Sequence, residues 1–207
     1  GTSGVNAIGS FQLSQLNSSS VQSKLKAAGI NTNSKQYKAA VKQMMSAGNG
    51  AMYGNIQGIK NLMSHYDKDG DYINPVNGLA GLLVTDENES SRKRIISIPD
   101  SSKEEMYELT KKEFLRENGV HNGDTTKRTD VYNNLYRKMS KKDRLAAGYT
   151  LEKYERIYRQ AFYDAAKKAD PNWEIGKPIK DGALDSVTRE TAESGKSPAQ
   201  ATLDTKI

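Results

Sequence analysis

Cysteine is absent from this chain of 207 residues, and tryptophan occurs once. The absence of cysteine excludes disulfide bonds, thiolate metal sites and thiol catalysis. A chain of this length buries roughly 70% of its unfolded surface on folding, so it does not need disulfides for stability. The lack of cysteine is compatible both with a reducing cytoplasm and with the exterior of a cell.

Long hydrophobic runs are missing as well. Hydrophobic residues make up 35% of the chain and the mean hydropathy is −0.78. No apolar run approaches the ~18 residues that a membrane span needs, so we expect no membrane-spanning segment. The sequence also lacks a Walker loop, a dinucleotide fingerprint, a zincin motif and a nucleophile elbow. We therefore expect a protein without enzymatic activity.

Acidic residues are missing from the first third of the chain. Residues 1–66 contain no aspartate or glutamate, and they carry six lysines, at positions 24, 26, 35, 38, 42 and 60. All of the formal net charge of +6 therefore lies in this part of the chain. Such an asymmetry is typical of an arm that meets an anionic partner, although a lysine-covered helical face in solvent gives the same pattern. Nucleic acid is not the expected partner, because residues 1–66 contain no arginine.

The hydrophobic pattern is mostly helical. Tyr37, Ala40, Val41 and Met44, for example, recur at the spacing of one buried helical face. The periodicity and the capping residues predict helices at roughly 20–28, 34–47, 51–66, 100–118, 129–139 and 151–169. Residues 94–98 alternate in part and are predicted to form a short strand. The predicted fold is mostly α, a small helical assembly of five or six helices with at most a minor strand pair.

Composition also suggests boundaries within the chain. Residues 1–20 are rich in Ser, Asn, Gln and Gly and are predicted to form an irregular arm. Residues 21–175 carry the helical pattern and are predicted to form the domain. From Gly176 the sequence becomes polar, so we expect residues 176–207 to form an extended tail.

One local motif stands out from this background. Asp67, Asp69 and Asp71 are the first three carboxylates of the chain, and they lie at alternate positions directly after a predicted helix. Hard cations such as calcium take six to eight oxygen ligands, which alternate residues of a loop can direct at one centre. The alternative is a solvated turn in which the aspartates make local hydrogen bonds. The crowding of three carboxylates favours a bound cation, with calcium ahead of magnesium.

In these respects the segment resembles the calcium loop of an EF-hand, or the related loops of dockerins. The resemblance implies that Asp67, Asp69 and Asp71 are ligands. The carbonyl of Tyr72 or of Ile73 is the candidate for a fourth ligand, with Ile73 preferred. Three positions depart from the EF-hand pattern. Tyr72 stands where a glycine at positive φ is usual, Pro75 stands at the ninth position, and Gly78 replaces the bidentate glutamate. Asn74, Asn77 or Asp86 are candidates for the remaining ligands.

Four longer stretches resemble a functionally uncharacterised family from spore-forming Gram-positive bacteria. They are residues 32–45 (TNSKQYKAAVKQMM), 59–81 (IKNLMSHYDKDGDYINPVNGLAG), 123–128 (GDTTKR) and 162–179 (FYDAAKKADPNWEIGKPI). The resemblance brings no activity with it and implies only a source. Together with the calcium loop, it favours the cell surface or the exterior over the cytoplasm.

Three functions remain open from the sequence. The first is a non-enzymatic structural or interaction protein with one calcium loop, whose partner is an unknown protein or anionic polymer. The second is a binding module for an anionic partner, a cell-wall polymer or nucleic acid, through the lysine-rich first third. The third is a hydrolase whose carboxylate pair is drawn from acids such as Glu105, Glu113 and Asp130. The two histidines, His65 and His121, lie far apart in the sequence, and neither is expected to be a ligand.

Overall fold

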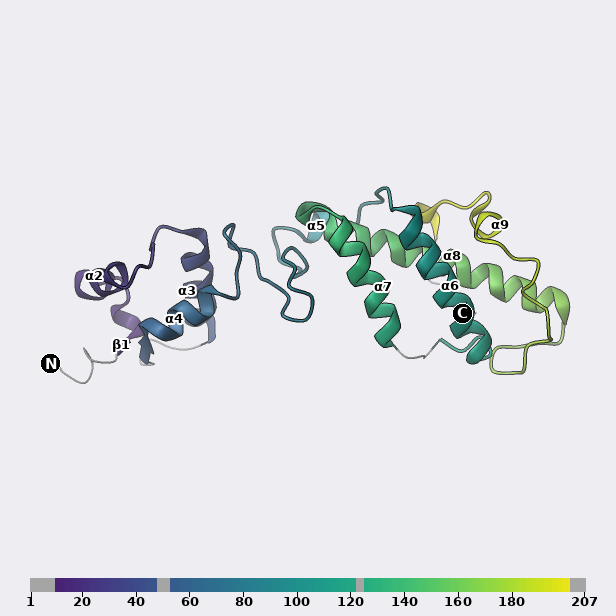
Figure 1. Ribbon diagram of the computed structural model, residues 1–207, viewed down its shortest axis with the longest axis horizontal. Coiled ribbons are helices and arrows are strands. Elements are labelled where there is room, and N and C mark those ends of the chain that lie inside the picture. The colour runs from purple at the N-terminus through teal and green to yellow at the C-terminus, as the bar shows by residue number, and fades with distance from the viewer. Residues whose placement is uncertain (1–9, 48–52, 122–124, 202–207) are drawn as a thin grey trace. The chain divides into compact units, whose positions relative to one another are not determined.

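The computed structural model describes residues 10–47, 53–121 and 125–201 (Figure 1). The chain divides into two compact units, residues 1–83 and residues 84–207. Within the described ranges it has eight α-helices and one two-stranded sheet, so the fold is mostly α as predicted. The helices exceed the predicted five or six because α5 and α9 are short segments without a periodic pattern of their own.

The first unit consists of three helices and a small sheet. Its elements are β1 (Ser10–Gln12), the 3₁₀ turn η1 (Leu13–Gln15), α2 (Ser19–Ala27), α3 (Lys35–Ala47), β2 (Tyr53–Asn55) and α4 (Ile56–Met63). The two strands pair antiparallel, with Phe11 opposite Gly54. A β-carbon at Gly54 would meet the Leu13 side chain at 2.9 Å, so the absence of a side chain there lets Leu13 enter the core.

Side-chain caps set where the helices of the first unit begin. The Ser18 hydroxyl accepts from the Val21 N–H at 3.2 Å, and the Ser34 hydroxyl accepts from the Tyr37 N–H at 3.0 Å. These polar side chains satisfy backbone donors that the first helical turn leaves without partners. The Asn55 side chain does the same at α4, so this helix begins after the strand, later than the predicted position 51.

One hydrophobic cluster holds this unit together. Its buried members are Phe11, Leu13, Leu16, Val21, Leu25, Ile30, Tyr37 and Ile59. The predicted buried face of α3 is confirmed, because Tyr37 and Ala40 are buried and Val41 and Met44 pack against the cluster. The described part of the expected arm, from residue 10 onward, therefore belongs to the core, and its first nine residues lie outside the described ranges.

The second unit is built on one long helix. Its elements are α5 (Glu89–Arg92), α6 (Asp100–Arg116), α7 (Thr125–Lys138), the 3₁₀ turn η2 (Lys141–Asp143), α8 (Arg144–Ala169), α9 (Arg189–Glu193) and the 3₁₀ turn η3 (Pro198–Gln200). With 26 residues, α8 is about 39 Å long and contacts α5, α6, α7, α9, η2 and η3. Met106, Phe114 and Leu135 of α6 and α7 are fully buried, as are Tyr158 and Phe162 of α8 itself.

Residues 94–98 do not form the predicted strand. The Ile96 N–H donates to the Thr150 hydroxyl at 3.1 Å, and that hydroxyl also lies 3.1 Å from the Arg94 carbonyl. A side chain of α8 thus supplies the hydrogen bonds that a neighbouring strand would have made. Thr150 lies inside α8, which begins at Arg144 and not at the predicted position 151.

Residues 176–201 are packed and do not form the expected extended tail. Leu184 and Ala192 are only 2% and 4% exposed, and the Trp173 indole donates to the Lys177 carbonyl at 2.7 Å. Thr188 and Thr191 form a reciprocal capping box at the start of α9. Short elements between glycines and prolines give no periodicity, so tertiary contacts decide their structure.

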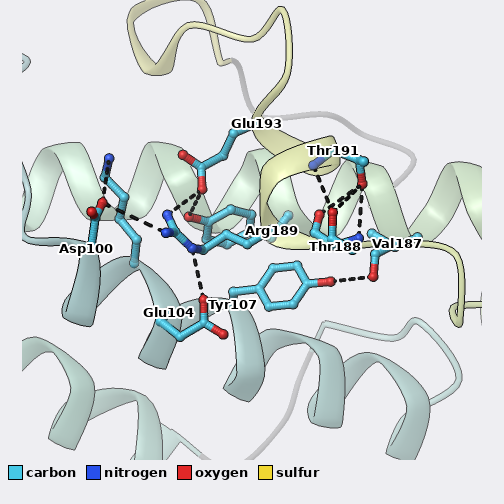
Figure 2. A network of polar contacts seen from close by, with 10 residues as sticks. Asp100, Glu104, Tyr107, Val187, Thr188, Arg189, Thr191 and Glu193 are labelled. Atoms are coloured by element: carbon cyan, nitrogen blue, oxygen red, sulfur yellow. Dashed lines mark hydrogen bonds and ion pairs between the residues drawn. The ribbon is translucent and has the colours of Figure 1, made fainter.

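A polar network fastens α9 to the rest of the second unit. Figure 2 shows the guanidinium of Arg189 between carboxylates, 2.9 Å from Glu104 and 2.8 Å from Glu193. The Tyr158 hydroxyl donates to Glu193 at 3.0 Å, and the Tyr107 hydroxyl donates to the Val187 carbonyl at 3.0 Å. Hydrogen bonds from α6 and α8 therefore fix this segment at both ends.

Among the described residues, no helix combines the length and the apolar character that crossing a membrane requires.

Candidate cation site

The aspartate motif forms a tight hairpin between α4 and the segment that follows. Tyr66 and Tyr72 face each other as an antiparallel bridge, and their rings meet edge to face with centroids 5.9 Å apart. Within the hairpin, the Asp67 N–H donates to the Asp71 carbonyl at 2.9 Å, and the Gly70 N–H donates to the Asp67 carbonyl at 3.0 Å. The chain therefore reverses within five residues.

The reversal brings the three predicted carboxylates together. Asp67, Asp69 and Asp71 each offer one oxygen, and these oxygens lie within 4.8 Å of one another. Asp67 is half-buried, whereas Asp69 and Asp71 are exposed. One oxygen of Asp67, Oδ1, accepts the Asp69 N–H at 3.0 Å and the Asp71 N–H at 2.9 Å. Asp67 thus shapes the turn from within, while the other two carboxylates face solvent.

Two contacts anchor the hairpin to α3. The Gln36 amide donates to the Met63 and Tyr66 carbonyls, at 2.9 Å each, and so joins α3 to the chain entering the loop. Gly70 has a φ of +82°, and a β-carbon at this position would lie 3.0 Å from the Lys35 carbonyl. Only glycine combines this left-handed backbone with so close an approach.

The hairpin differs from an EF-hand loop in where the chain turns. Gly70, the fourth residue of the motif, takes the positive φ that the EF-hand pattern places at the sixth. Tyr72 stands at that sixth position without a positive φ and pairs with Tyr66. Moreover, α4 ends at Met63 and does not run to Tyr66 as predicted. The carboxylates converge through a shorter turn than the one that the resemblance implied.

The further ligands expected from the sequence lie beyond the hairpin. Ile73 donates its N–H to the His65 carbonyl at 2.8 Å, and a role for its own carbonyl stays a prediction. The Asn74 side chain accepts from Val76, and the Asn77 side chain accepts from Leu79, both at 2.9 Å. These two amides are thus engaged in turns of their own. Asp86 belongs to the second unit.

A family model for a domain of unknown function, DUF3879, matches residues 30–207. The chain belongs to the DUF3879 family. The match includes α3, the aspartate hairpin and the whole of the second unit, so it confirms the expected uncharacterised family. No curated protein and no solved structure matches the chain.

The DUF3879 chain has a second polar cluster, which sequence reasoning missed. Glu113 of α6 and Glu155 of α8 are 3% and 5% exposed, and both contact Nη2 of Arg128 in α7. His121 places its Nε2 3.4 Å from Glu155 Oε1, and its own side chain is partly exposed. Arg159 is buried beside them, donates to the Gly119 carbonyl at 2.9 Å and covers the Phe114 ring.

The charges of this cluster nearly balance, with two carboxylates and two guanidinium groups. Burial is the main cause that lowers the pKa of the Arg159 guanidinium. Burial, aided by Glu155 and Glu152, also raises the pKa of the nearby Tyr132 hydroxyl. The cluster joins three helices through charged groups that are mostly withdrawn from water. No local pattern in the sequence reveals the cluster, because its charged members lie on three different helices and only tertiary structure brings them together.

The other two acidic residues weighed from the sequence, Glu105 and Asp130, do not belong to this cluster. Glu105 accepts from the Asn134 amide at 3.0 Å, and Asp130 is exposed on α7. Two arginines of the second unit also serve internal contacts, since Arg94 pairs with Asp143 at 3.3 Å and the Arg128 guanidinium holds the buried cluster. The aspartate hairpin is thus the one group of metal-type ligands found among the described residues.

Proposed function

We propose that this DUF3879 protein binds one divalent cation, with calcium preferred, in the hairpin of residues 67–71, and that it is a non-enzymatic structural or interaction protein. The observation that carries the proposal is the grouping of one oxygen each from Asp67, Asp69 and Asp71 within 4.8 Å. Three carboxylates held so closely repel one another, and a divalent cation removes that repulsion.

The ligand chemistry favours calcium. All three side chains offer oxygen, which hard cations prefer, and Asp69 and Asp71 are exposed, so water has access to complete the shell. Calcium accepts six to eight oxygens in flexible arrangements, whereas magnesium demands a nearly ideal octahedron. The Ile73 carbonyl is the proposed fourth protein ligand.

The expected consequence of binding is local stability. The hairpin is tied to α3 through Gln36 and Gly70, so an ion that stabilises the hairpin stabilises the packing of α3 on α4. A ligand at 100 times its dissociation constant adds about 2.7 kcal/mol to the free energy of unfolding. The effect belongs to the first unit, which contains all three carboxylates.

Thermal unfolding of the whole chain tests the proposal, in EDTA, in calcium and in magnesium. Far-UV circular dichroism follows the helices of both units, whereas fluorescence of Trp173, which is buried in the second unit, reports that unit alone. A transition seen by circular dichroism but not by fluorescence therefore belongs to the first unit. We expect calcium to raise the transition of the first unit by several degrees and magnesium to raise it less. An unchanged transition in calcium would contradict the proposal.

The decisive variant is Asp69→Asn/Asp71→Asn. It keeps Asp67, whose Oδ1 accepts the two N–H groups that shape the turn, and so it removes ligand charge without removing the turn. Asp130→Asn/Glu174→Gln is the matched control, because it removes two exposed negative charges from the second unit. The calcium effect should vanish in the first variant and persist in the control.

The two tyrosines that flank the hairpin provide a direct readout of binding. Terbium occupies calcium sites and emits when a nearby tyrosine transfers energy to it. Tyr66 and Tyr72 stand on either side of the aspartate motif. We expect tyrosine-sensitised terbium emission that calcium displaces and that the Asp69→Asn/Asp71→Asn variant lacks. Emission that survives in the variant would place the ion elsewhere.

A further inference from the structure

Three lysines line the face of α3 that points away from the core. Lys35, Lys38 and Lys42 are exposed and follow one another at i, i+3 and i+7, which places them on one side of the helix. The buried residues Tyr37 and Ala40 occupy another side. We name Lys35, Lys38 and Lys42 the lysine stripe. It extends over about 10 Å along the helix axis.

Within the part of the chain that the structure describes, the lysines of the stripe are not engaged in ion pairs. No described ion pair involves Lys35, Lys38 or Lys42, and residues 1–66 contain no aspartate or glutamate. In the second unit, by contrast, Arg94, Arg128 and Arg189 all form ion pairs. The lysine stripe is therefore available to neutralise charge on another molecule.

The choice of lysine over arginine indicates which chemical groups the stripe can bind. Lysine carries a compact point charge that suits phosphate, whereas base recognition usually uses arginine forks and stacking aromatics. The first unit contains no arginine. Of the aromatic side chains described there, Phe11 and Tyr37 are buried, and Tyr66 and Tyr72 pack against each other. The stripe is thus equipped to hold phosphates but not to read bases.

We propose that the lysine stripe of α3 binds a flexible linear polymer of phosphodiester-linked polyols, and that a cation in the aspartate hairpin strengthens this binding. The narrow row of charges along one helix matches a single polymer chain better than a flat membrane. Binding by such a row is electrostatic, so its affinity falls with added salt.

The hairpin lies at the end of the stripe, which couples the two. Gly70 packs on the carbonyl of Lys35, the first residue of α3 and the first lysine of the stripe. At physiological ionic strength, charges interact over about 8 Å. The aspartates therefore weaken the attraction of the stripe for a polyanion, and a bound divalent cation relieves this effect. This part of the inference rests on the proposed function.

Binding of poly(glycerol phosphate) to the whole chain tests the proposal, by titration over a range of salt concentrations, in EDTA and in calcium. We expect Lys35→Gln/Lys38→Gln/Lys42→Gln to lose at least about tenfold in affinity, and the slope of log K against log[salt] to become shallower by about 2. Lys112→Gln/Lys168→Gln/Lys180→Gln is the control, because it removes three exposed lysines from the second unit. Equal losses in both triple variants would overturn the proposal.

Two further probes test the choice of partner. Single-stranded DNA and vesicles of anionic lipid present phosphate with bases or as a flat surface. We expect both to bind more weakly than poly(glycerol phosphate) at equal salt. Tighter binding of the DNA would identify a nucleic-acid surface, and tighter binding of the vesicles a membrane surface. Either result would overturn the proposed partner.

The titrations in EDTA and in calcium separate this inference from the proposed function. We expect calcium to tighten polymer binding severalfold, and Asp69→Asn/Asp71→Asn to bind in EDTA as tightly as the unmodified chain binds in calcium. If that variant tightens binding but calcium does not, the cation site fails and the stripe stands. If calcium stabilises the first unit but the stripe variant binds normally, the stripe fails and the cation site stands.

Discussion

Gly148 of α8 lies directly against Tyr136 of α7, so closely that a β-carbon at position 148 would fall 2.6 Å from the phenolic oxygen. The missing side chain lets the two helices approach each other at this point. The same tyrosine is largely withdrawn from water, and this burial raises the pKa of its hydroxyl. From this contact we predict how a side chain at position 148 would affect the packing of α8 on α7.

Gly148→Ala should destabilise the second unit. Overpacking of this kind costs about 1–3 kcal/mol, while alanine in place of glycine inside a helix returns about 1 kcal/mol. We expect a net loss of about 1 kcal/mol in the free energy of unfolding, measured with urea and Trp173 fluorescence. Tyr136→Phe in the same chain removes the closest atom and should recover part of the loss. A stabilised Gly148→Ala protein would show that the ring moves aside freely.

Arg128→Met should be more damaging, because it leaves Glu113 and Glu155 buried without the cation that both contact. Removing one partner of a buried ion pair costs about 3–5 kcal/mol. The same urea titration measures this change. Arg116→Met breaks the exposed pair with Glu117 and should cost less than about 1 kcal/mol. Equal effects of the two substitutions would mean that the buried cluster adds little.

The second unit should lose stability in alkali. Burial raises the pKa of the Tyr132 and Tyr158 hydroxyls, and for Tyr158 the neighbouring Glu193 adds to the effect. Above pH about 10 the unfolded chain releases these protons while the folded state retains them. The stability is therefore complete below that pH and falls as the pH rises, by up to about 1.4 kcal/mol per pH unit for each tyrosine.

Urea unfolding at several alkaline pH values measures this slope, again by Trp173 fluorescence. Tyr132→Phe removes one of the two phenols, so its stability should fall less steeply with pH than that of the unmodified chain. Parallel curves for the two proteins would contradict the assignment.

Gly70→Ala should loosen the aspartate hairpin. Alanine at a φ of +82° is strained, and its β-carbon would lie 3.0 Å from the Lys35 carbonyl. Gly78 has a similar φ, but a β-carbon there meets nothing within 4 Å, so Gly78→Ala isolates the backbone strain of about 1 kcal/mol. We expect Gly70→Ala to lower the unfolding temperature of the first unit by more than Gly78→Ala, and to reduce terbium emission. Equal effects would show that the contact with Lys35 is unimportant.

The sequence predicted the elements whose signals are local. The hydrophobic spacing of Tyr37, Ala40, Val41 and Met44 predicted α3 correctly, because one helical face must be buried for this helix to pack. The grouping of the three aspartates was predicted as well, since alternate positions of a short turn bring side chains together. The turn differs from the EF-hand loop that it resembles in sequence, because the positive φ belongs to Gly70 and not to the sixth position.

Other features depend on distant residues and left no local signal. Residues 94–98 alternate like a strand, yet Thr150 of α8 supplies their hydrogen bonds, and nothing near residue 94 reveals this. The packing of residues 176–201 depends on Arg189 meeting Glu104, which lies 85 positions earlier in the chain. Spacing along the sequence cannot reveal such pairs, because tertiary structure alone brings them together.

The contact between Arg189 and Glu104 also bears on the order in which the chain matures during synthesis. The first unit ends at residue 83, so all of its buried partners exist before most of the second unit has been translated. The second unit needs Leu184, Ala192 and Arg189 to close over α6 and α8, and these residues are made late. Since domains fold as units from the N-terminus onward, the ribosome exposes a finished first unit together with an open α6 and α7. A nascent chain arrested before residue 184 should therefore resist protease in its first unit alone.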